Sequence, residues 1–235
     1  MEIIYGKNPV MSFLNNDMIK EIYLTENFAD KNFIGTIKKS NIKYSFQKKS
    51  FLDKLAATDK HQGIIAIIKD FNYTEYSDLI KYSKTKENPF ILVLDKIEDP
   101  HNFGAIIRTC EALGVDGIII SKHHSCPLNA TVAKVSTGAI ANLRICQVTN
   151  INQTLQDLKK QGYWIYAAEA NQGQSYQNLK FDGEKVLVVG SEGYGISPLV
   201  IKQADFRIFI PMKGKVNSLN VSVATAILIA KMIQN

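Results

Sequence analysis

Three blocks of small and polar residues follow apolar runs in this chain, and they carry the side chains best suited to chemistry. They extend over residues 95–109, 190–195 and 213–220. In α/β proteins, ligands bind where buried strands end and give way to polar loops. Because each block follows such a run, the three predict a single ligand site built from distant parts of the chain.

The first block contains Asn102 and Arg108, six residues apart on a predicted helix over residues 102–113 that Gly114 ends. This spacing places the two side chains on different faces. Asn102, in the first turn, can serve simply as a helix cap. Arg108 lies mid-helix among apolar neighbours. It can reach outward to a surface ion pair, or its planar fork can bind an RNA phosphate or ribose oxygen.

The second block reads Gly190-Ser191-Glu192-Gly193-Tyr194-Gly195. Its glycines are spaced G-x-x-G-x-G, which differs from the G-x-G-x-x-G of dinucleotide-binding proteins, and it lacks the Lys-Ser/Thr pair of a P-loop. Taken alone, the block predicts a tight turn. Its glycines also permit the close approach of a flat ligand such as adenine.

The third block leads into a predicted final helix over residues 218–233, for which Ser218 is a plausible N-cap. Capping explains Ser218 but not the polar loop 213–217, nor Asn220 near the helix start. Free backbone donors at a helix N-terminus bind ligands readily. The third block is therefore also a candidate for ligand contact.

The composition predicts a soluble, cytoplasmic protein. At 235 residues, with 46% hydrophobic and 21% charged residues, the chain has enough apolar material for a sizeable core in one or two domains. No apolar run approaches the length of a membrane span, and no signal peptide is recognisable. Three widely spaced cysteines and four histidines show no metal-ligand spacing, so we expect no metal.

The net charge of +6 and the pI near 9.0 favour a polyanionic partner, although lysine-rich usage alone explains them equally well. One stretch without acidic residues gathers several lysines with Tyr44 and Phe46 between them. The lysines are Lys38, Lys39, Lys43, Lys48 and Lys49. This lysine cluster is either an RNA-binding surface or an ordinary solvated face.

Apolar periodicity predicts an α/β unit in residues 1–72, a linker at 73–88 that includes a short helix at 74–83, and a second domain in residues 89–235. In the first unit the predicted helices are 8–15, 33–39 and 51–57, and the predicted strands are 21–24, 42–46 and 64–68. In the second the strands are 90–94, 117–120, 145–148, 164–167, 186–189 and 206–210, and the further helices are 129–140, 151–161 and 198–203. This alternation, with almost wholly apolar strands, predicts a parallel sheet covered on both faces.

Together and in this order, the three blocks resemble the motifs of the SpoU/TrmH family of RNA ribose methyltransferases. The resemblance extends over the whole chain. Residues 5–10, 61–64, 128–131 and 134–139 are similar to the family's bacterial 23S rRNA guanosine 2′-O-methyltransferase branch. The resemblance implies an N-terminal substrate-binding domain like ribosomal protein L30e and a C-terminal SPOUT domain with a deep trefoil knot. Sequence patterns alone do not predict such a knot. The resemblance also implies a homodimer with S-adenosylmethionine (SAM) bound in the knot.

The resemblance implies functional residues as well. Those implied for the cofactor are Val189, Gly190, Ile210, Met212, Ser218 and Leu219, and those implied for catalysis are Asn102, Arg108, Glu192 and Asn220. An arginine guanidinium is effectively never deprotonated in proteins, so we interpret Arg108 as a clamp on RNA phosphate that stabilises developing negative charge, not as a base. For Glu192, a role in holding the loop by hydrogen bonds is favoured over a role as general base.

The resulting hypothesis is SAM-dependent methylation of a ribose 2′-hydroxyl, in a guanosine of 23S rRNA. One alternative is a tRNA ribose methyltransferase of the same family, and another is a catalytically silent RNA-binding or ribosome-assembly factor. A nicotinamide dehydrogenase is disfavoured by the glycine spacing. No DNA, membrane or metal partner is expected.

Overall fold

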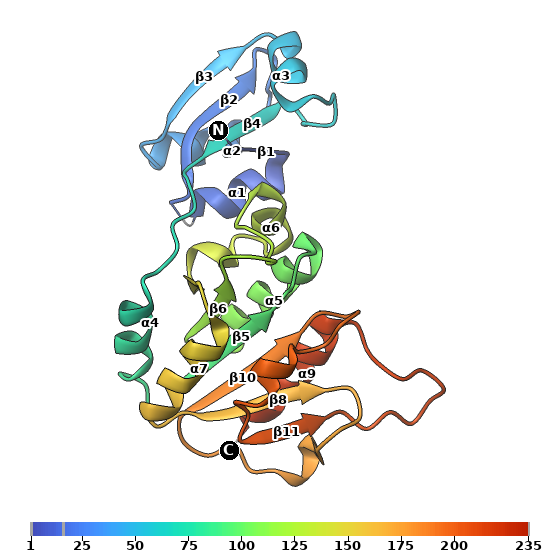
Figure 1. Ribbon diagram of the computed structural model, residues 1–235. Coiled ribbons are helices and arrows are strands. Elements are labelled where there is room, and N and C mark those ends of the chain that lie inside the picture. Colours follow the sequence, from blue (N-terminus) through green and yellow to red (C-terminus); the bar gives the residue numbers. More distant parts are fainter. Residues whose placement is uncertain (1, 16, 235) are drawn as a thin grey trace. The chain divides into compact units, whose positions relative to one another are not determined.

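Two separate β-sheets divide the chain, which the computed structural model describes over residues 2–15 and 17–234 (Figure 1). One unit comprises the chain up to Asn72 together with Leu128–Asn142, and the other comprises Tyr73–Pro127 and the chain from Leu143 onward. This division differs from the predicted boundaries in two respects. Segment 128–142 belongs with the N-terminal unit, and the region predicted as a linker belongs with the second unit.

The first unit is built on a four-stranded mixed sheet with strand order β1-β4-β2-β3. Its elements are β1 (Ile3–Tyr5), α1 (Lys7–Asn15), β2 (Ile19–Thr25), α2 (Lys31–Lys39), β3 (Lys43–Gln47), α3 (Lys49–Ala56), β4 (Ile64–Ile68), α6 (Ala130–Val135) and the 3-10 helix η1 (Ala139–Ala141). All five residues of β4 are buried, as expected of a central strand without polar positions. Strand β1 was not predicted, because three residues are too few to show a period.

The helix predicted over 129–140 is interrupted. Its first part, α6, is capped by Asn129, whose Oδ1 accepts a hydrogen bond from Val132 N at 3.0 Å. Thr137 and Gly138 then adopt positive φ angles of 52° and 86°, which end the helix before η1. Ser12 Oγ of α1 donates to Thr137 O at 2.5 Å, joining this segment to the first unit.

The second unit contains a seven-stranded sheet with strand order β7-β6-β5-β10-β8-β11-β9, and every pairing in it is parallel. Its strands are β5 (Phe90–Asp95), β6 (Gly117–Ser121), β7 (Arg144–Val148), β8 (Trp164–Glu169), β9 (Gln174–Ser175), β10 (Lys185–Gly190) and β11 (Phe206–Phe209). Its helices are α4 (Tyr76–Ser83), α5 (Pro100–Ala112), α7 (Ile151–Lys160), the 3-10 helix η2 (Tyr176–Asn178), α8 (Pro198–Ile201) and α9 (Val221–Met232). The predicted α/β class with a parallel sheet is confirmed. The two-residue strand β9 was not predicted, and the knot stays a prediction.

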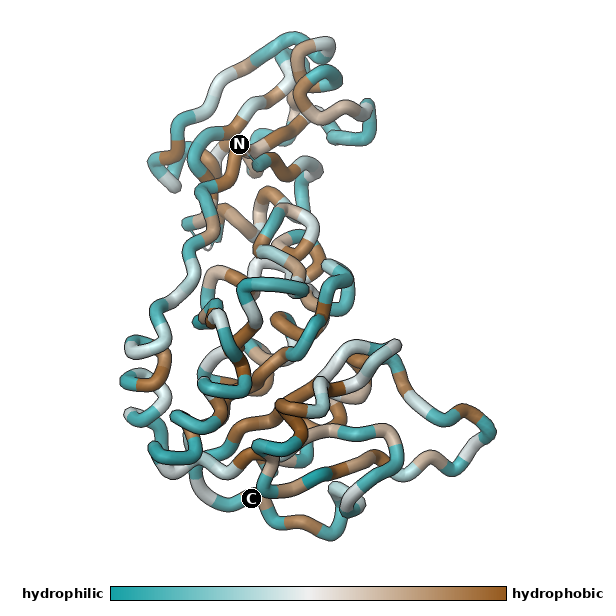
Figure 2. The backbone as a smooth tube through the Cα atoms, viewed as in Figure 1, coloured by the Kyte–Doolittle hydropathy of each residue, from teal (hydrophilic) through white to brown (hydrophobic). Residues whose placement is uncertain are grey.

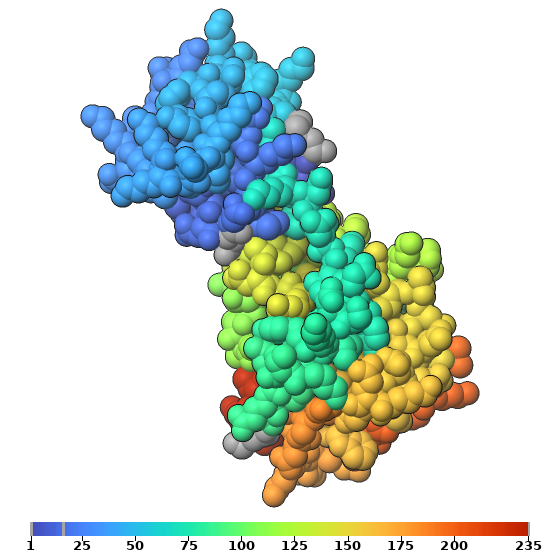
Figure 3. All heavy atoms as spheres, turned by 90° about the vertical axis from the view of Figure 1, so that its left-hand side faces the viewer, coloured from blue at the N-terminus to red at the C-terminus, as the bar shows by residue number. Residues whose placement is uncertain are grey.

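Both faces of this sheet are covered. On one face, apolar residues of α4, α7 and α8 form a core with alternate strand residues such as Val93 and Val188. On the other face α5 packs on α9, and α9 packs on β10. Figure 2 shows the hydrophobic residues along these strands, and Figure 3 shows α4 on the surface next to α7. There Tyr76 Oη donates to Asp157 Oδ2 at 2.6 Å. In the described part of the chain, no helix is long and apolar enough to cross a membrane.

Strands β5 and β10 are neighbours at the centre of the sheet, with Gly190 paired opposite Asp95 at their carboxyl ends. Strands β8 and β11 follow beyond β10. The loops that leave these four strands therefore start along one edge, which brings the three polar blocks of the sequence together.

Candidate active site

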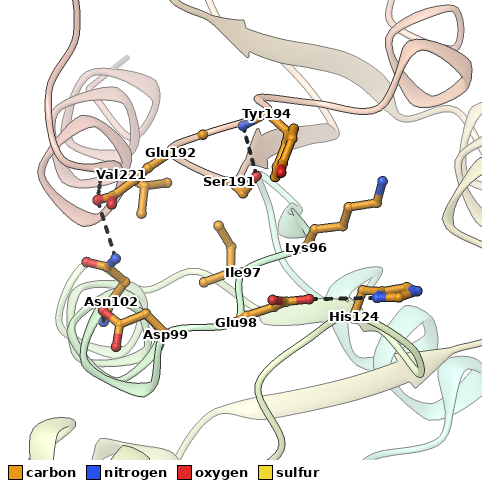
Figure 4. Close-up of a pocket in the computed structure, with 11 residues that line it drawn as sticks. Lys96, Ile97, Glu98, Asp99, Asn102, His124, Ser191, Glu192, Tyr194 and Val221 are labelled. Carbon is orange, nitrogen blue, oxygen red and sulfur yellow. Dashed lines mark hydrogen bonds and ion pairs between the residues drawn. The ribbon is translucent and has the colours of Figure 1, made fainter.

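Three polar side chains from three distant segments form a closed ring of hydrogen bonds. Glu192 Oε1 accepts from Asn102 Nδ2 at 3.3 Å and from Asn220 Nδ2 at 2.5 Å. Asn220 Nδ2 also donates to Asn102 Oδ1 at 2.9 Å, and Val221 N donates to Glu192 Oε1 at 3.2 Å. Figure 4 shows Asn102 and Glu192 facing one another. One carboxylate oxygen thus joins the segments that carry all three motifs.

Asn102 can join this ring because another residue caps its helix. Of the two roles that the sequence leaves open for Asn102, capping is excluded: the N-cap of α5 is Asp99, whose carboxylate accepts from the backbone N–H groups of His101 and Asn102 at 3.1 and 3.3 Å. Pro100 occupies the first helical position, where no N–H is needed. The side chain of Asn102 is left to point away from the helix end, toward Glu192.

Asn220 serves the ring and its own helix at once. The predicted start at Ser218 is wrong, since α9 begins at Val221 and its N-cap is Asn220. Asn220 Oδ1 accepts from Ser222 N at 3.0 Å and from Val223 N at 3.4 Å, while Nδ2 supplies the ring. The amide carries both an acceptor and donors, which a serine hydroxyl cannot present in the same geometry.

The loop after β10 is held tightly against its own strand. A Cβ on Gly190 would lie 2.1 Å from Gly195 C and 2.3 Å from Ile196 N, so only glycine fits there. Gly195 N donates to Ser191 O at 2.8 Å and closes the turn. Buried Asp95 accepts from Ser197 N at 2.6 Å, which fixes the far end of the loop to β5.

One cavity of about 440 Å³ lies at the carboxyl ends of β8, β10 and β11. All six residues predicted for the cofactor line it, namely Val189, Gly190, Ile210, Met212, Ser218 and Leu219. The wall also includes Glu169, whose side chain is 11% exposed. Within the described residues, Glu169 Oε1 is buried without a hydrogen-bond partner, and Arg207 Nε lies 3.8 Å away. The cavity thus combines an apolar lining with a carboxylate oxygen that can accept a hydrogen bond.

A second cavity, also of about 440 Å³, is shown in Figure 4. Asn102, Glu98 and Lys96 line one side of it, and Tyr194, 93% exposed, lines the other. Both cavities share the residues Ser191, Glu192, Gly193, Tyr194 and Val221. Within the hydrogen-bonded ring, Glu192 therefore belongs to the wall between two spaces of similar size, while Asn102 lines only the second cavity and Asn220 lines neither.

Arg108 is the predicted catalytic residue that the fold does not bring into this group. It lies on α5 six residues beyond Asn102, its side chain is exposed, and it lines neither of the two cavities. Its interaction with the reacting atoms stays a prediction.

The five residues of the lysine cluster are all exposed in the first unit, at the end of α2, on β3 and at the start of α3. Lys43 Nζ pairs with Glu21 at 3.0 Å, and hydrogen bonding to that carboxylate raises the pKa of Lys43. Because β3 is an edge strand, lysines on it also discourage strand pairing with other chains. Contact of these lysines with RNA stays a prediction.

Several wall residues were not predicted individually, including Glu169 at the end of β8, Asn171 after it, and Lys96 and Glu98 within the first polar block. The sequence does contain a signal for these wall residues, because they are polar residues close to the end of an apolar strand. The same pattern marks the three blocks. After the strand at 164–167 no glycine-rich motif follows, so the polar residues there do not stand out in the sequence.

The three cysteines are free and buried, and burial raises the pKa of Cys146 to about 11. Among the described residues, no group of three or more His, Cys, Asp or Glu side chains is placed to hold a metal ion.

Residues 89–230 match the model of the SpoU rRNA Methylase family. The chain belongs to this SpoU/TrmH family of RNA methyltransferases. Residues 3–74 match a second model, described as RNA 2′-O ribose methyltransferase substrate binding. The SpoU match contains the ring and both cavities.

Known SpoU relatives resemble this chain along most of its length. YacO of Bacillus subtilis, named as a TrmH family tRNA/rRNA methyltransferase, is 39% identical over 97% of this chain and 93% of its own. The SpoU methyltransferase AviRb of Streptomyces viridochromogenes, crystallised with AdoMet, shares the fold with a TM-score of 0.82 at 17% identity, over 99% of this chain and 89% of AviRb. The TrmH/SpoU tRNA modifying enzyme of A. aeolicus is 30% identical with a TM-score of 0.58, over 67% of this chain and 82% of its own.

Proposed function

We propose that this protein transfers the methyl group of SAM to a ribose 2′-hydroxyl of RNA, in a guanosine of 23S rRNA. The observation that carries the proposal is the pair of adjoining cavities, whose shared wall includes Glu192, the residue that hydrogen-bonds Asn102 and Asn220. A transfer between two bound molecules requires two neighbouring spaces and fixed groups where they meet. The donor is assigned to the cavity at the strand ends, and the acceptor nucleoside to the cavity of Figure 4.

The residues of the strand-end cavity suit an adenosine-containing cofactor. Its volume of about 440 Å³ lies within the usual range for small-ligand sites. Apolar side chains such as Ile210 and Leu219 can cover a base, and the absence of a side chain at Gly190 allows close backbone approach. Glu169 Oε1, buried without a hydrogen-bond partner in the described chain, can accept from a ribose hydroxyl. When bound, SAM supplies an activated methyl group.

The side chains of the ring contribute mainly by holding one another and the start of α9 in place. Glu192 Oε1 already accepts three hydrogen bonds, so it holds Asn102 and Asn220 and fixes the N-terminus of α9 beside the acceptor space. We assign Arg108 to the RNA phosphate next to the reacting ribose, where a guanidinium stabilises developing negative charge on the 2′-oxygen. The proton of the hydroxyl then leaves to a phosphate oxygen or to water.

Ribosomal RNA is favoured over tRNA by the extent of the matches. The A. aeolicus tRNA modifying enzyme covers 67% of this chain, whereas a separate substrate-binding model covers residues 3–74. A tRNA substrate remains the second candidate, because the name of YacO includes both RNA classes. A map of methylated riboses in 23S rRNA and tRNA from a deletion strain separates the two. The proposal includes a cytoplasmic location, where both RNAs occur.

The proposal also includes a homodimer. Helix α9 is mainly apolar and its polar residues do not gather on one face, yet Val223 is 48% exposed and Ile227 is half-buried. A helix without a polar face normally buries all its sides. A second copy of this chain supplies an apolar surface to cover α9, and Arg108 lies on α5, which packs on α9.

We expect calorimetric titration of the protein with SAM to give saturable binding, and titration with NAD to give none, because the glycine spacing after β10 does not suit a dinucleotide. The same preparation is then incubated with labelled SAM and total RNA. Label in 23S rRNA supports the full proposal, and label in tRNA alone supports the second candidate. A folded protein that binds no SAM would refute the proposed function.

We expect Arg108→Ala to lower the rate of methyl transfer about 100-fold, the usual effect of removing a group that stabilises developing charge. The affinity for SAM should not change, because Arg108 does not line the strand-end cavity. Arg108→Lys, which keeps the charge but loses the planar fork, should have intermediate activity. Full activity of Arg108→Ala in single-turnover assays would remove Arg108 from the catalytic group.

A further inference from the structure

A third cavity, of about 480 Å³, lies in the first unit and is separate from the site described above. Its lining includes residues of the two N-terminal motifs that the proposed function leaves without a role. Lys7 begins α1, while His61, Gln62 and Gly63 precede β4. Lys7 N donates to Gln62 Oε1 at 3.0 Å, so segments 55 residues apart meet at this cavity.

The loop before β4 is held in an unusual conformation by a buried histidine. His61 is 1% exposed, its Nδ1 accepts from Gly63 N at 3.0 Å, and its Nε2 lies 2.9 Å from Asp53 Oδ1. Because Nδ1 accepts, Nε2 carries the proton of the neutral ring and donates to Asp53. Gln62 has a φ of 55°, which is strained for a residue other than glycine. Strain of this kind persists where surrounding contacts enforce it, and it is concentrated at binding sites.

The shape of this loop also depends on Gly63. Its φ is 76°, and a Cβ there would lie 2.8 Å from Thr25 Oγ1 and 3.2 Å from Phe28 Cδ2. Both neighbours line the cavity. The loop backbone can therefore approach Thr25 and Phe28 only because position 63 has no side chain.

The chemistry of the lining matches a nucleotide. Lys7 and Lys49 provide cations, Asp30 and Asp59 provide carboxylates, and Phe28 provides a half-buried aromatic ring. Lys7 Nζ is oriented by Asp30 Oδ2 at 2.9 Å and lies 5.5 Å from the centre of the Phe28 ring. The hydrogen bond from Lys7 N occupies the side-chain oxygen of Gln62, Oε1. It thereby orients the side-chain nitrogen of Gln62, which has two hydrogens to donate. Unpaired RNA bases are bound by this combination of aromatic surface, hydrogen-bonding side chains and nearby cations.

We propose that this cavity binds one unpaired nucleotide of the substrate RNA, with the base against Phe28 and the phosphate near Lys7 and Lys49. The inference rests on the proposed function and gives the first unit a defined contact with RNA, in addition to the lysine cluster. The two contacts differ physically. Stacking on an aromatic ring depends little on salt, whereas binding through exposed lysines weakens steeply as salt rises.

The test measures binding of the full-length protein to a fluorescein-labelled single-stranded RNA of about twenty nucleotides and mixed sequence, at about 50 and about 200 mM salt. Phe28→Leu should weaken binding about tenfold at both salt concentrations. The control, Lys38→Ala with Lys39→Ala, should weaken binding mainly at low salt and make the salt dependence shallower. Phe28→Tyr, which keeps the ring, should bind like the unmodified protein.

Thermal unfolding of each variant shows whether the first unit remains folded, because Phe28 also contacts Phe33 edge to face. If Phe28→Leu unfolds, photo-crosslinking of 4-thiouridine-substituted RNA to the unmodified protein decides instead, with crosslinks expected in peptides containing Phe28 or Gln62. A folded Phe28→Leu protein that binds RNA normally, or crosslinks elsewhere only, overturns the inference. If such a protein also methylates RNA normally, the proposed function stands. An unmodified protein that binds SAM but neither binds nor methylates RNA overturns both.

Discussion

Replacing Gly190 by alanine is expected to reduce the affinity for SAM below detection in calorimetric titration. The new Cβ would lie 2.1 Å from Gly195 C, 2.2 Å from Gly195 O and 2.3 Å from Ile196 N, all of them backbone atoms. These atoms cannot move alone, because Gly195 N donates a hydrogen bond to Ser191 O and the backbone N–H of Ser197 donates one to Asp95. The loop must therefore shift as a whole, and the loop forms part of the wall of both cavities.

The same substitution should also destabilise the fold. Overpacking of this kind typically costs about 1–3 kcal/mol, which in a protein of this size corresponds to a fall in Tm of roughly 2–12 °C. Gly214→Ala is the matched control, since a Cβ at position 214 meets no atom within 4 Å. It should leave both Tm and SAM affinity unchanged. Normal SAM binding by Gly190→Ala would show that the strand-end cavity is not the cofactor site.

A pair of substitutions at Glu192 should separate a positioning role from a role as general base. Glu192→Ala removes the acceptor of hydrogen bonds from Asn102, Asn220 and Val221, and we expect methyl transfer to fall about 100-fold as the ring loses its alignment. Glu192→Gln keeps an oxygen at the end of the side chain, so it should retain activity within about tenfold of the unmodified protein. The measurement is the single-turnover rate at saturating SAM across a range of pH.

The shape of the pH profile gives an independent result. If Glu192 positions its neighbours, Glu192→Gln changes the height of the profile but not its form. If Glu192 removes the proton from the ribose hydroxyl, Glu192→Gln should be as inactive as Glu192→Ala and should lose the corresponding limb of the profile. Glu87→Gln, at an exposed carboxylate before β5, controls for the loss of one negative charge.

Much of the second unit follows from local sequence patterns. The apolar runs that form β5, β6 and β10 leave few alternatives to buried strands, and their alternation with helices implies parallel pairing. Because polar residues come directly after these runs, the site could be expected at their carboxyl ends. The six residues that the family resemblance implied for the cofactor all line one cavity at this edge.

Details of the site depend on which residue caps a helix, and local preference does not distinguish the candidates. Asp99 and Asn102 are both good caps, as are Ser218 and Asn220. The choice is made by contacts with Glu192, which is 90 residues from Asn102 and 28 from Asn220 in the sequence. A pattern within a few residues carries no information about partners so far apart.

By itself, then, the sequence determined the α/β class, the parallel sheet and the family, because these depend on hydrophobic periodicity and on motif residues in a fixed order. Only the tertiary structure decided that Asn102, Glu192 and Asn220 form one ring while Arg108 lies apart, and that segment 128–142 belongs with the N-terminal unit. It also decided that Lys7 and Gln62 meet at one cavity. The reason is physical: these are contacts between side chains brought together by packing across long loops, and they are stabilised by distant partners rather than by neighbours in the chain.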